Sequence, residues 1–266
     1  MDVMHMGTIT YAAFEKTTQF TWMIPDHRRW PSKALQLERQ RLASVMRTRN
    51  HVVVVAEDVY DSDEAAKANV TIPSGDPAPN PASHWAEGRA VVGVAIWRFD
   101  DNSTRIGQFE AQQQAGLFPR FSTIRPPLPS HDEHQDRYEV VLDVMKEKHF
   151  RSCGMTLETL VVHPAYAGRG HGRRLLEWGR ALADMDGVAI GVAASDISLE
   201  FYRKYHYQLL ETLRLEGDAI SPAGLTTYIM KYVPPTYQQE IGTTEGLESL
   251  RTRLWKRIAK YTCTGT

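Results

Sequence analysis

The sequence predicts an α/β (α+β) fold, in which a β-sheet is flanked by helices, and three observations support this. An apolar run ending at residues 160–162 is followed by a glycine-rich loop and then by a helix with one apolar face. Residues 51–56 and 90–99 are apolar and β-branched, which predicts two strands. Residues 188–193 are small or branched and apolar, as in a buried strand. With 266 residues, of which 42% are hydrophobic, the chain can bury a full core, and one elaborated domain is expected rather than two.

The N-terminal half is expected to place two helices before these strands. Residues 9–20 are interpreted as helical, and Ser32 is a candidate N-cap for a helix that continues to about Arg47. Residues 58–88, acidic at first and then proline-rich, separate the two strands and are expected to form an exposed, partly disordered insertion. A second insertion spans residues 100–150.

That second insertion contains apolar residues at helical spacing from Asp132 to Phe150, which predicts a helix. Its aromatic residues either form a wall for an acceptor substrate or simply cover the sheet. They are Phe109, Phe118, Phe121 and Tyr138.

The C-terminal half is expected to alternate helices and strands. The helix after the glycine-rich loop should end near Asp186, and Ser195 or Asp196 can cap a short helix after the strand at 188–193. Two more strands are predicted, at residues 208–215 and 225–233. We therefore expect one domain over residues 1–235. Residues 236–266 are expected to form a helical extension whose leucines pack on the parent domain or on a second subunit.

The loop between residues 162 and 175 has the composition of a phosphate-binding turn. Gly168, Gly170 and Gly172 allow close backbone approach, and the N–H groups of the following helix favour an anion. The spacing is G-x-G-x-G rather than the G-x-G-x-x-G of a dinucleotide fingerprint, and no Gly-Lys-Ser/Thr follows. The residues therefore predict a site for a phosphorylated cofactor.

This loop resembles the acyl-CoA pyrophosphate loop of the GNAT N-acetyltransferase superfamily, which follows the pattern Gln/Arg-x-x-Gly-x-Gly/Ala. Gly170 and Gly172 match, whereas Ala167 stands where the family usually has Gln or Arg. A second family segment follows the next strand, with the pattern Leu/Ala-x-x-Tyr-x-x-x-Gly-Phe. Tyr202 matches its tyrosine, and His206-Tyr207 replaces the usual Gly-Phe.

The resemblance implies a twisted mixed sheet with helices on both faces and an antiparallel hairpin centred on Gly93. It also implies that acetyl-CoA, as the acyl-donor substrate, binds where two parallel strands splay apart. The residues that the resemblance assigns to the donor are Leu160, Val161, Val162, Ala167, Gly168, Arg169, Gly170, His171, Gly172, Arg173, Ser198 and Tyr202.

The implied reaction is direct attack of an amine on the thioester, and two residues are catalytic candidates. Tyr202 would protonate the departing CoA thiolate as general acid, or it is simply a core tyrosine. Glu158 would take a proton from the incoming ammonium, directly or through water, or it is an ordinary surface residue. His163 is a weaker candidate base with an expected structural role. Cys153 is far from Cys263 in the sequence, and a covalent acyl-cysteine route is not favoured.

Composition narrows the class of partner. The formal net charge of −1 gives no general attraction to nucleic acid or anionic membranes. We expect a small-molecule amine or a peptide as acceptor, no metal, a monomer or homodimer, and a cytoplasmic protein. The run from His131 to His134 has metal-ligand residue types, but four adjacent helical residues cannot all face one ion.

Two other classes of function fit the same sequence. One is a catalytically silent module that binds CoA or acyl-CoA, which the departures at Ala167 and His206-Tyr207 favour. The other is a nucleotide-binding protein with a different anion on the same loop.

Overall fold

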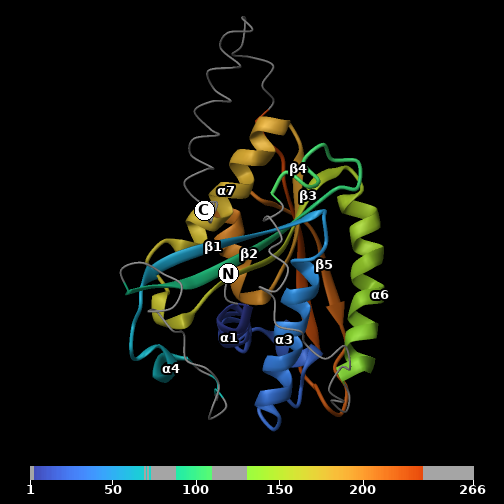
Figure 1. Cartoon of the computed structure of the whole chain (residues 1–266). Helices are drawn as coiled ribbons and strands as arrows, with labels where there is room; N and C mark the ends of the chain where they lie inside the picture. Colours follow the sequence, from blue (N-terminus) through green and yellow to red (C-terminus); the bar gives the residue numbers. More distant parts are fainter. Residues whose placement is uncertain (1–2, 69, 71, 73–87, 110–130, 236–266) are drawn as a thin grey trace, which may run out of the picture.

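The centre of the molecule is a six-stranded sheet in the order β1-β2-β3-β4-β6-β5 (Figure 1). The computed structural model describes residues 3–68, 70, 72, 88–109 and 131–235. Among the strands described, only β3 and β4 pair in parallel, so the sheet is mixed, as predicted. The strands are β1 (His51–Val59), β2 (Arg89–Phe99), β3 (Cys153–Val162), β4 (Ala189–Ala194), β5 (Gln208–Leu215) and β6 (Leu225–Tyr232).

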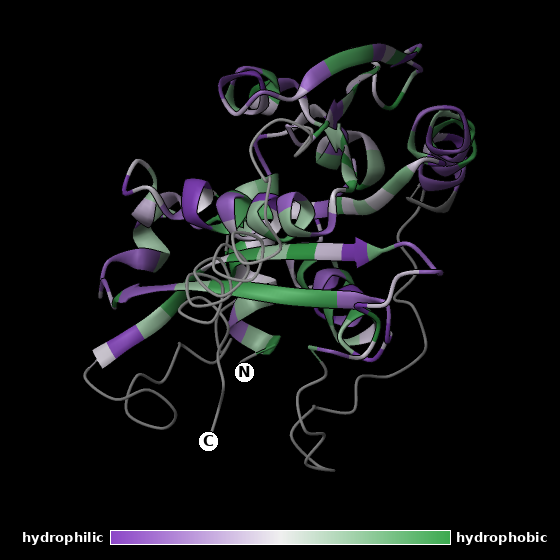
Figure 2. Ribbon diagram, turned by 90° about the horizontal axis from the view of Figure 1, so that it is seen from above, coloured by the Kyte–Doolittle hydropathy of each residue, from purple (hydrophilic) through white to green (hydrophobic). Residues whose placement is uncertain are grey.

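Helices cover both faces of this sheet, and the strands between them are largely hydrophobic (Figure 2). On one face, α1 (Val3–Phe14) and α3 (Pro31–Val45) contact each other, and α1 packs on β2 and β3. On the other face, α7 (His171–Asp186) crosses β1 to β4. A Cβ at Gly179 of α7 would overlap the indole ring of Trp97, so the helix can lie this close to β2 only with glycine there.

The predicted helix at residues 9–20 is two helices, α1 and α2 (Thr18–Met23). Thr17 separates them, because its Oγ1 accepts a hydrogen bond from the Phe20 N–H (3.1 Å) and so caps α2. The break also leaves Glu15 and Lys16 in the link between the helices. Likewise, α3 begins with Pro31 at its first turn, so Ser32 lies inside the helix and is not its N-cap.

The second insertion contributes α6 (His131–Phe150), close to the predicted 132–150. It contacts α2, β5 and β6, and the Phe150 ring occupies the space that a side chain at Gly191 would need. His134 stacks on Trp22 of α2 (4.4 Å between ring centroids), and its Nε2 lies 2.8 Å from Asp218 Oδ2. The inserted helix is therefore joined both to α2 and to the β5–β6 connection.

The first insertion is only partly within the described residues. It includes a short helix, α4 (Glu64–Lys67), and Glu64 is buried rather than exposed, because its carboxylate accepts a hydrogen bond from Tyr166 (2.9 Å). Phe118, Phe121 and the extension at 236–266 lie outside the described residues. No helix in the described part of the chain is long and apolar enough to cross a membrane.

Candidate active site

The parallel strands β3 and β4 pair only at their beginnings. Their register runs from Cys153–Ala189 to Leu157–Val192 and stops there, although β3 continues to Val162. Along the same stretch β3 stays paired with β2, up to Val162 opposite Gly93. From residue 158 onward, the edge of β3 that faces β4 therefore pairs with no described strand, which is the splay expected from the resemblance.

A β-bulge lies at the point where the splay begins. Opposite β2, Ile96 pairs with Thr159 and Trp97 pairs with Leu157, so Glu158 is an extra residue without a partner. Strict alternation predicts Glu158 and Leu160 on one face of β3. Because of the bulge, Leu160 instead packs in the core between the sheet and α7. Glu158 contacts His51 and Arg98. The residues next to these two in their strands point into that core, so Glu158 lies on the opposite face from Leu160.

The glycine loop follows the unpaired end of β3 through a short 3₁₀ turn, Pro164–Tyr166. Gly168 (φ 78°) and Gly170 (φ 86°) are left-handed, and an added Cβ at either would meet no atom of the residues that the structure describes within 4 Å. Gly170 precedes the first turn of α7 and offers no side-chain cap. The Arg174 N–H is bonded to the Gly170 carbonyl, which leaves the N–H groups of residues 171–173 without partners inside the helix.

The start of α7 is held by an acidic residue of β1 that the sequence did not single out. Asp58 Oδ2 lies 2.9 Å from His171 Nε2 and 3.1 Å from an Arg169 guanidinium nitrogen. Burial raises the pKa of Asp58, but hydrogen bonds with His171, Val59 and Arg169 outweigh this and leave the pKa below its ordinary value. Asp58 is therefore ionised and binds both His171 and Arg169. It was predicted from the sequence to belong to an exposed acidic segment.

The arginines of the loop differ in their contacts. Arg169 bonds to Asp58 and the Ala165 carbonyl and lies over the Tyr166 ring, so the protein itself engages its guanidinium group. Arg173 donates to Glu177 one turn further along (2.8 Å). Arg174 is exposed and has no ion pair with any residue that the structure describes.

Tyr202 lies on α8 (Leu199–Lys204), beyond the end of β4. Its ring is buried and packs edge-on against Phe201 and Tyr207. Phe201 also lies 3.9 Å from the Cβ position of Gly172, so α8 reaches the first turn of α7. Burial raises the pKa of Tyr202 well above its ordinary value, which keeps the phenol protonated at neutral pH.

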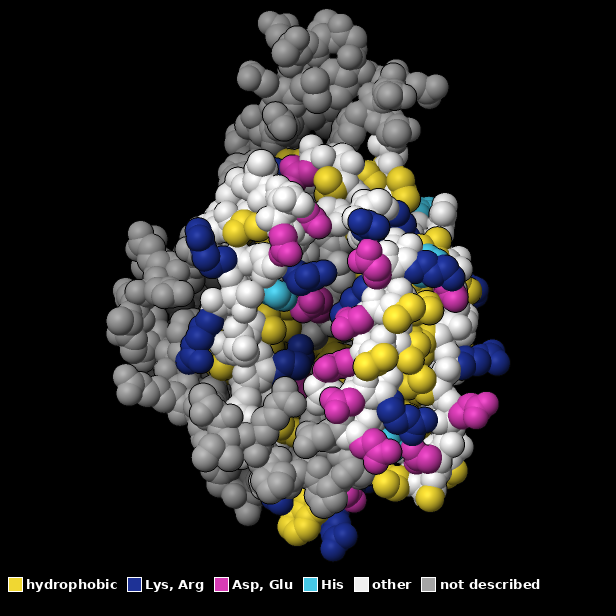
Figure 3. Space-filling view, turned by 90° about the vertical axis from the view of Figure 1, so that its right-hand side faces the viewer, with side chains coloured by type: hydrophobic (Ala, Val, Ile, Leu, Met, Phe, Trp, Pro, Cys, Tyr) yellow, Lys and Arg dark blue, Asp and Glu magenta, His cyan; other side chains and the backbone are white. Residues whose placement is uncertain are grey.

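Glu158 is partly enclosed and paired. Its side chain is 26% exposed, with Oε2 3.2 Å from His51 Nε2 and Oε1 3.5 Å from Arg98 Nε. Burial raises its pKa, but the hydrogen bond with His51 and the charges of His51, Lys146 and Arg98 outweigh burial and lower it. Figure 3 shows charged side chains of both signs around a hollow on the face that carries α6.

Three other candidates have clear structural surroundings. His163 is fully buried and its Nδ1 accepts the Ala165 N–H (3.2 Å), in keeping with a structural role. Burial raises the pKa of the Cys153 thiol, which opposes a nucleophilic role. Ser198 Oγ donates to the Ser195 carbonyl, while Asp196 accepts from Thr18 N–H (3.5 Å); neither Ser195 nor Asp196 caps α8 with its side chain.

A mixed sheet with one splayed parallel pair, followed by a glycine loop that opens a helix, is the architecture of the GNAT superfamily. No protein-family model matches the chain. A curated protein from Stachybotrys chartarum named "Acetyltransferase" is 26% identical to it over 221 residues, which cover 82% of each chain.

Two solved structures are also similar in fold. One, described as histone acetyltransferase HPA2 and related acetyltransferase from Corynebacterium glutamicum, has a TM-score of 0.47 and 19% identity, covering 88% of this chain and 93% of that chain. The other, arylalkylamine N-acetyltransferase 2 from Aedes aegypti, has a TM-score of 0.45 and 14% identity, covering 86% of this chain and 94% of that chain.

The curated relative, together with this chain's own strand order, splay and loop, confirms the prediction made from the sequence. The chain is thus similar to an acetyltransferase, and its sheet and loop have the arrangement that the resemblance to the GNAT superfamily implies.

Proposed function

We propose that the protein transfers an acetyl group from acetyl-CoA to the amine of a small acceptor by direct attack. The observation that carries this proposal is the unpaired edge of β3 from residue 158 to Val162, which leads directly into the glycine loop. An extended pantetheine can add to such an edge as a further strand would, while a pyrophosphate occupies the adjacent helix N-terminus.

The loop fits a pyrophosphate through its backbone. No atom of the described residues lies within 4 Å of a Cβ added at Gly168 or Gly170, and the N–H groups of His171, Gly172 and Arg173 begin α7. Ala167 stands where the family pattern has Gln or Arg, so the loop lacks one long polar side chain. It keeps all of its backbone N–H donors. Arg174 is the loop arginine best placed to add a charge-assisted contact, because Arg169 is bound to Asp58.

The acyl transfer requires the acceptor nitrogen to lose two protons, one before attack and one as the amide forms, and the sulfur to gain one. As the nitrogen forms its bond to the acetyl carbon, negative charge develops on the carbonyl oxygen, and a backbone N–H near Val161 or Val162 stabilises it. The C–S bond then breaks, the thiolate takes the phenolic proton of Tyr202, and the second proton of the nitrogen returns to the phenolate through water. The phenol carries its proton at neutral pH, as a proton donor must, and burial raises its pKa and so makes it a weaker acid than a free tyrosine.

Glu158 is proposed to receive the proton that the incoming ammonium must lose before its nitrogen can attack. Its position in the bulge places it beside the start of the splay, and its lowered pKa keeps it ionised at neutral pH. A carboxylate already paired with His51 is a weak base, so transfer through a water molecule is favoured over direct transfer.

Thiol release tests the proposed function. The full chain is incubated with acetyl-CoA and a panel of amines, and free CoA is measured over time. Amine-dependent release supports acetyl transfer. Calorimetric binding of CoA without release for any amine would identify a silent binding module, and binding of ATP or NAD in place of CoA would overturn the assignment of the loop.

A further inference from the structure

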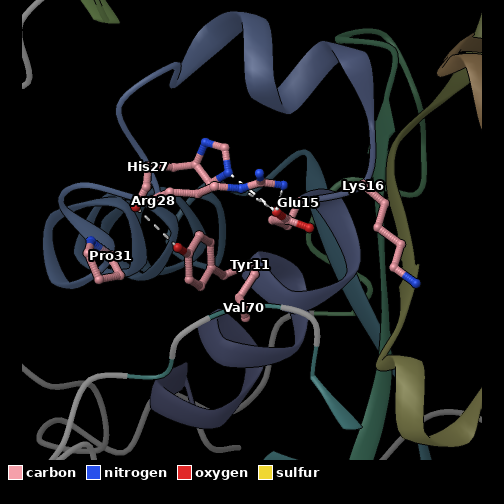
Figure 4. Close-up of a pocket in the computed structure, with 7 residues that line it drawn as sticks. All are labelled: Tyr11, Glu15, Lys16, His27, Arg28, Pro31 and Val70. Carbon is pink, nitrogen blue, oxygen red and sulfur yellow. Dashed lines mark hydrogen bonds and ion pairs between the residues drawn. The ribbon is translucent and has the colours of Figure 1, made fainter.

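A cavity of about 390 Å³ lies beside the link between α1 and α2 (Figure 4). Tyr11, Glu15, His27 and Arg28 contribute to its lining. The link ends at Thr18, whose N–H donates to Asp196, a residue shortly after the end of β4. The link that borders the cavity therefore contacts the segment that follows β4.

The cavity contains two hydrogen-bond acceptors that the protein does not fully satisfy. Glu15 is buried, and its Oε1 accepts two hydrogen bonds from Arg28 (2.6 and 3.0 Å), while Oε2 has no hydrogen bond to any described residue. His27 Nε2 is buried without a partner in the described part of the chain and lies 3.6 Å from Glu15 Oε1.

The tautomer of His27 follows from its other nitrogen. Nδ1 lies 2.8 Å from the Ile24 carbonyl oxygen, which can only accept, so Nδ1 carries a proton. In the neutral ring Nε2 is then an acceptor that faces a carboxylate, with no hydrogen between them. A ligand group with several N–H donors would satisfy both atoms, which a carboxylate or an apolar ligand would not.

We infer that this cavity binds a cationic nitrogen, a primary ammonium or a guanidinium, of an acceptor that carries a second amine. The inference rests on the proposed function, because it takes the acetylated amine to lie at the splay. Glu15 supplies the charge, His27 Nε2 a second acceptor and the Tyr11 ring an aromatic wall. Two cations among the described residues line the cavity, Lys16 and Arg28; the Arg28 side chain, which is 77% exposed, binds Glu15 and is the one that the ligand must displace or share there.

Binding of hexane-1,6-diamine and hexylamine to the full chain, measured by calorimetry, tests this inference. We expect the diamine to bind at least about tenfold more tightly, because only the diamine can place an ammonium on Glu15 when its other end lies at the splay. Equal binding of the two, or preferential binding of hexanedioate, would overturn the inference.

Two variants with opposite expected effects separate binding from folding. Glu15→Gln should weaken diamine binding by about tenfold, whereas Arg28→Met should strengthen it by removing the internal competitor. The matched control is Glu147→Gln, which changes an exposed glutamate that also pairs with an arginine (Arg151, 3.4 Å). A purely structural role for Glu15 predicts losses in both cavity variants, and that result would refute the site.

Thiol release distinguishes this inference from the proposed function. Hexylamine needs only the acyl-transfer centre, so its turnover reports that function alone. Turnover of hexylamine without preference for the diamine overturns the second site and leaves acetyl transfer standing. Diamine binding that depends on Glu15, without any thiol release, supports the site and overturns the proposed function.

Discussion

The carboxylate of Asp58 lies 2.9 Å from Nε2 of His171 and so joins the end of β1 to the first residue of α7. The two residues are far apart in sequence, and the glycine loop lies just before the second of them. His171 is 4% exposed and the Asp58 side chain 25% exposed, so the contact is shielded from water on the histidine side. Gly168 and Gly170 allow the loop backbone to adopt several conformations. We therefore infer that the contact between Asp58 and His171 fixes the orientation of the N–H groups at the start of α7.

Replacing Asp58 should therefore weaken the donor site without changing the chemistry. Asp58→Asn removes the charge that holds His171 and Arg169, and a lost charge-assisted hydrogen bond costs about 1.5–3 kcal/mol. We expect the KM for acetyl-CoA to rise about tenfold or more, with kcat nearly unchanged. Asp63→Asn, which changes an exposed acid near α4, is the control. Equal losses in kcat and kcat/KM would argue against a positioning role.

Gly170→Asp should nearly abolish CoA binding. The change adds bulk and a negative charge beside the N–H groups of α7, where an anion is proposed to bind. Gly88→Asp is a matched control, because Gly88 is also left-handed (φ 68°) and also open within 4 Å. Calorimetry with CoA on both folded variants measures the difference. Unchanged CoA affinity in Gly170→Asp would refute the loop as the pyrophosphate site.

Tyr202→Phe should lower kcat by about 10²–10⁴-fold, the range expected for loss of a general acid, and leave acetyl-CoA affinity nearly intact. Tyr207→Phe is its control: Tyr207 packs 5.3 Å from Tyr202, and its buried hydroxyl has no partner among the described residues. Steady-state kinetics of both variants should therefore differ sharply. A loss below about threefold for Tyr202→Phe would assign that ring to the core alone.

Glu158→Gln should reduce the rate most near neutral pH and least at high pH, where the acceptor amine is already deprotonated. Because the pKa of Glu158 is lowered, the residue stays ionised as the pH falls to its ordinary range. Glu211→Gln is a close control, since Glu211 is also a strand residue that pairs with a histidine and a cation, His149 and Lys148. A loss of rate that is independent of pH would indicate a structural role for Glu158.

His163 predicts a pH dependence of stability. Burial is the main cause that lowers its pKa to about 4. The unfolded chain therefore takes up a proton near the ordinary value of about 6.5, while the folded protein does not. The contribution of the neutral ring to the free energy of unfolding is complete above about pH 6.5 and is lost as the pH falls toward 4. The loss amounts to about 2 kcal/mol at pH 5.

Urea unfolding at about pH 7.5 and about pH 5 checks this. His163→Asn keeps an acceptor for the Ala165 N–H but cannot titrate, so its free energy of unfolding should fall by about 2 kcal/mol less than that of the native chain. His206→Asn is the control, because His206 is exposed and left-handed (φ 65°), a conformation that asparagine tolerates. An equal pH dependence in native and His163→Asn proteins would contradict the prediction.

The order of strands and helices could be predicted because it depends on local patterns. The strand β2 and the helix α6 were predicted almost at their observed bounds, since apolar spacing alone defines them. The break between α1 and α2 was missed, because one threonine cap at Thr17 interrupts an otherwise continuous pattern.

The chemistry of the site could be predicted only where one segment carries it. The glycine loop and Tyr202 lie within recognisable motifs. By contrast, Asp58 and His51 contribute through contacts with His171 and Glu158, more than 100 residues away, and nothing in their own neighbourhoods indicates a partner. The bulge at Glu158 is likewise a property of pairing with β2, which alternation along β3 does not reveal.

The single unpaired residue at Glu158 divides β3 into two parts with different sensitivities to change. Before it, the strand has neighbours on both sides, and substitutions there should chiefly affect folding. After it, one edge is free, so the same kinds of substitution act on whatever binds along that edge. If β3 kept Glu158 but passed this point without the bulge, strict alternation would exchange the faces of Leu160 and Val161 and turn a helix-packing side chain toward the opposite layer. The donor-binding half of the strand thus depends on an irregularity one residue long.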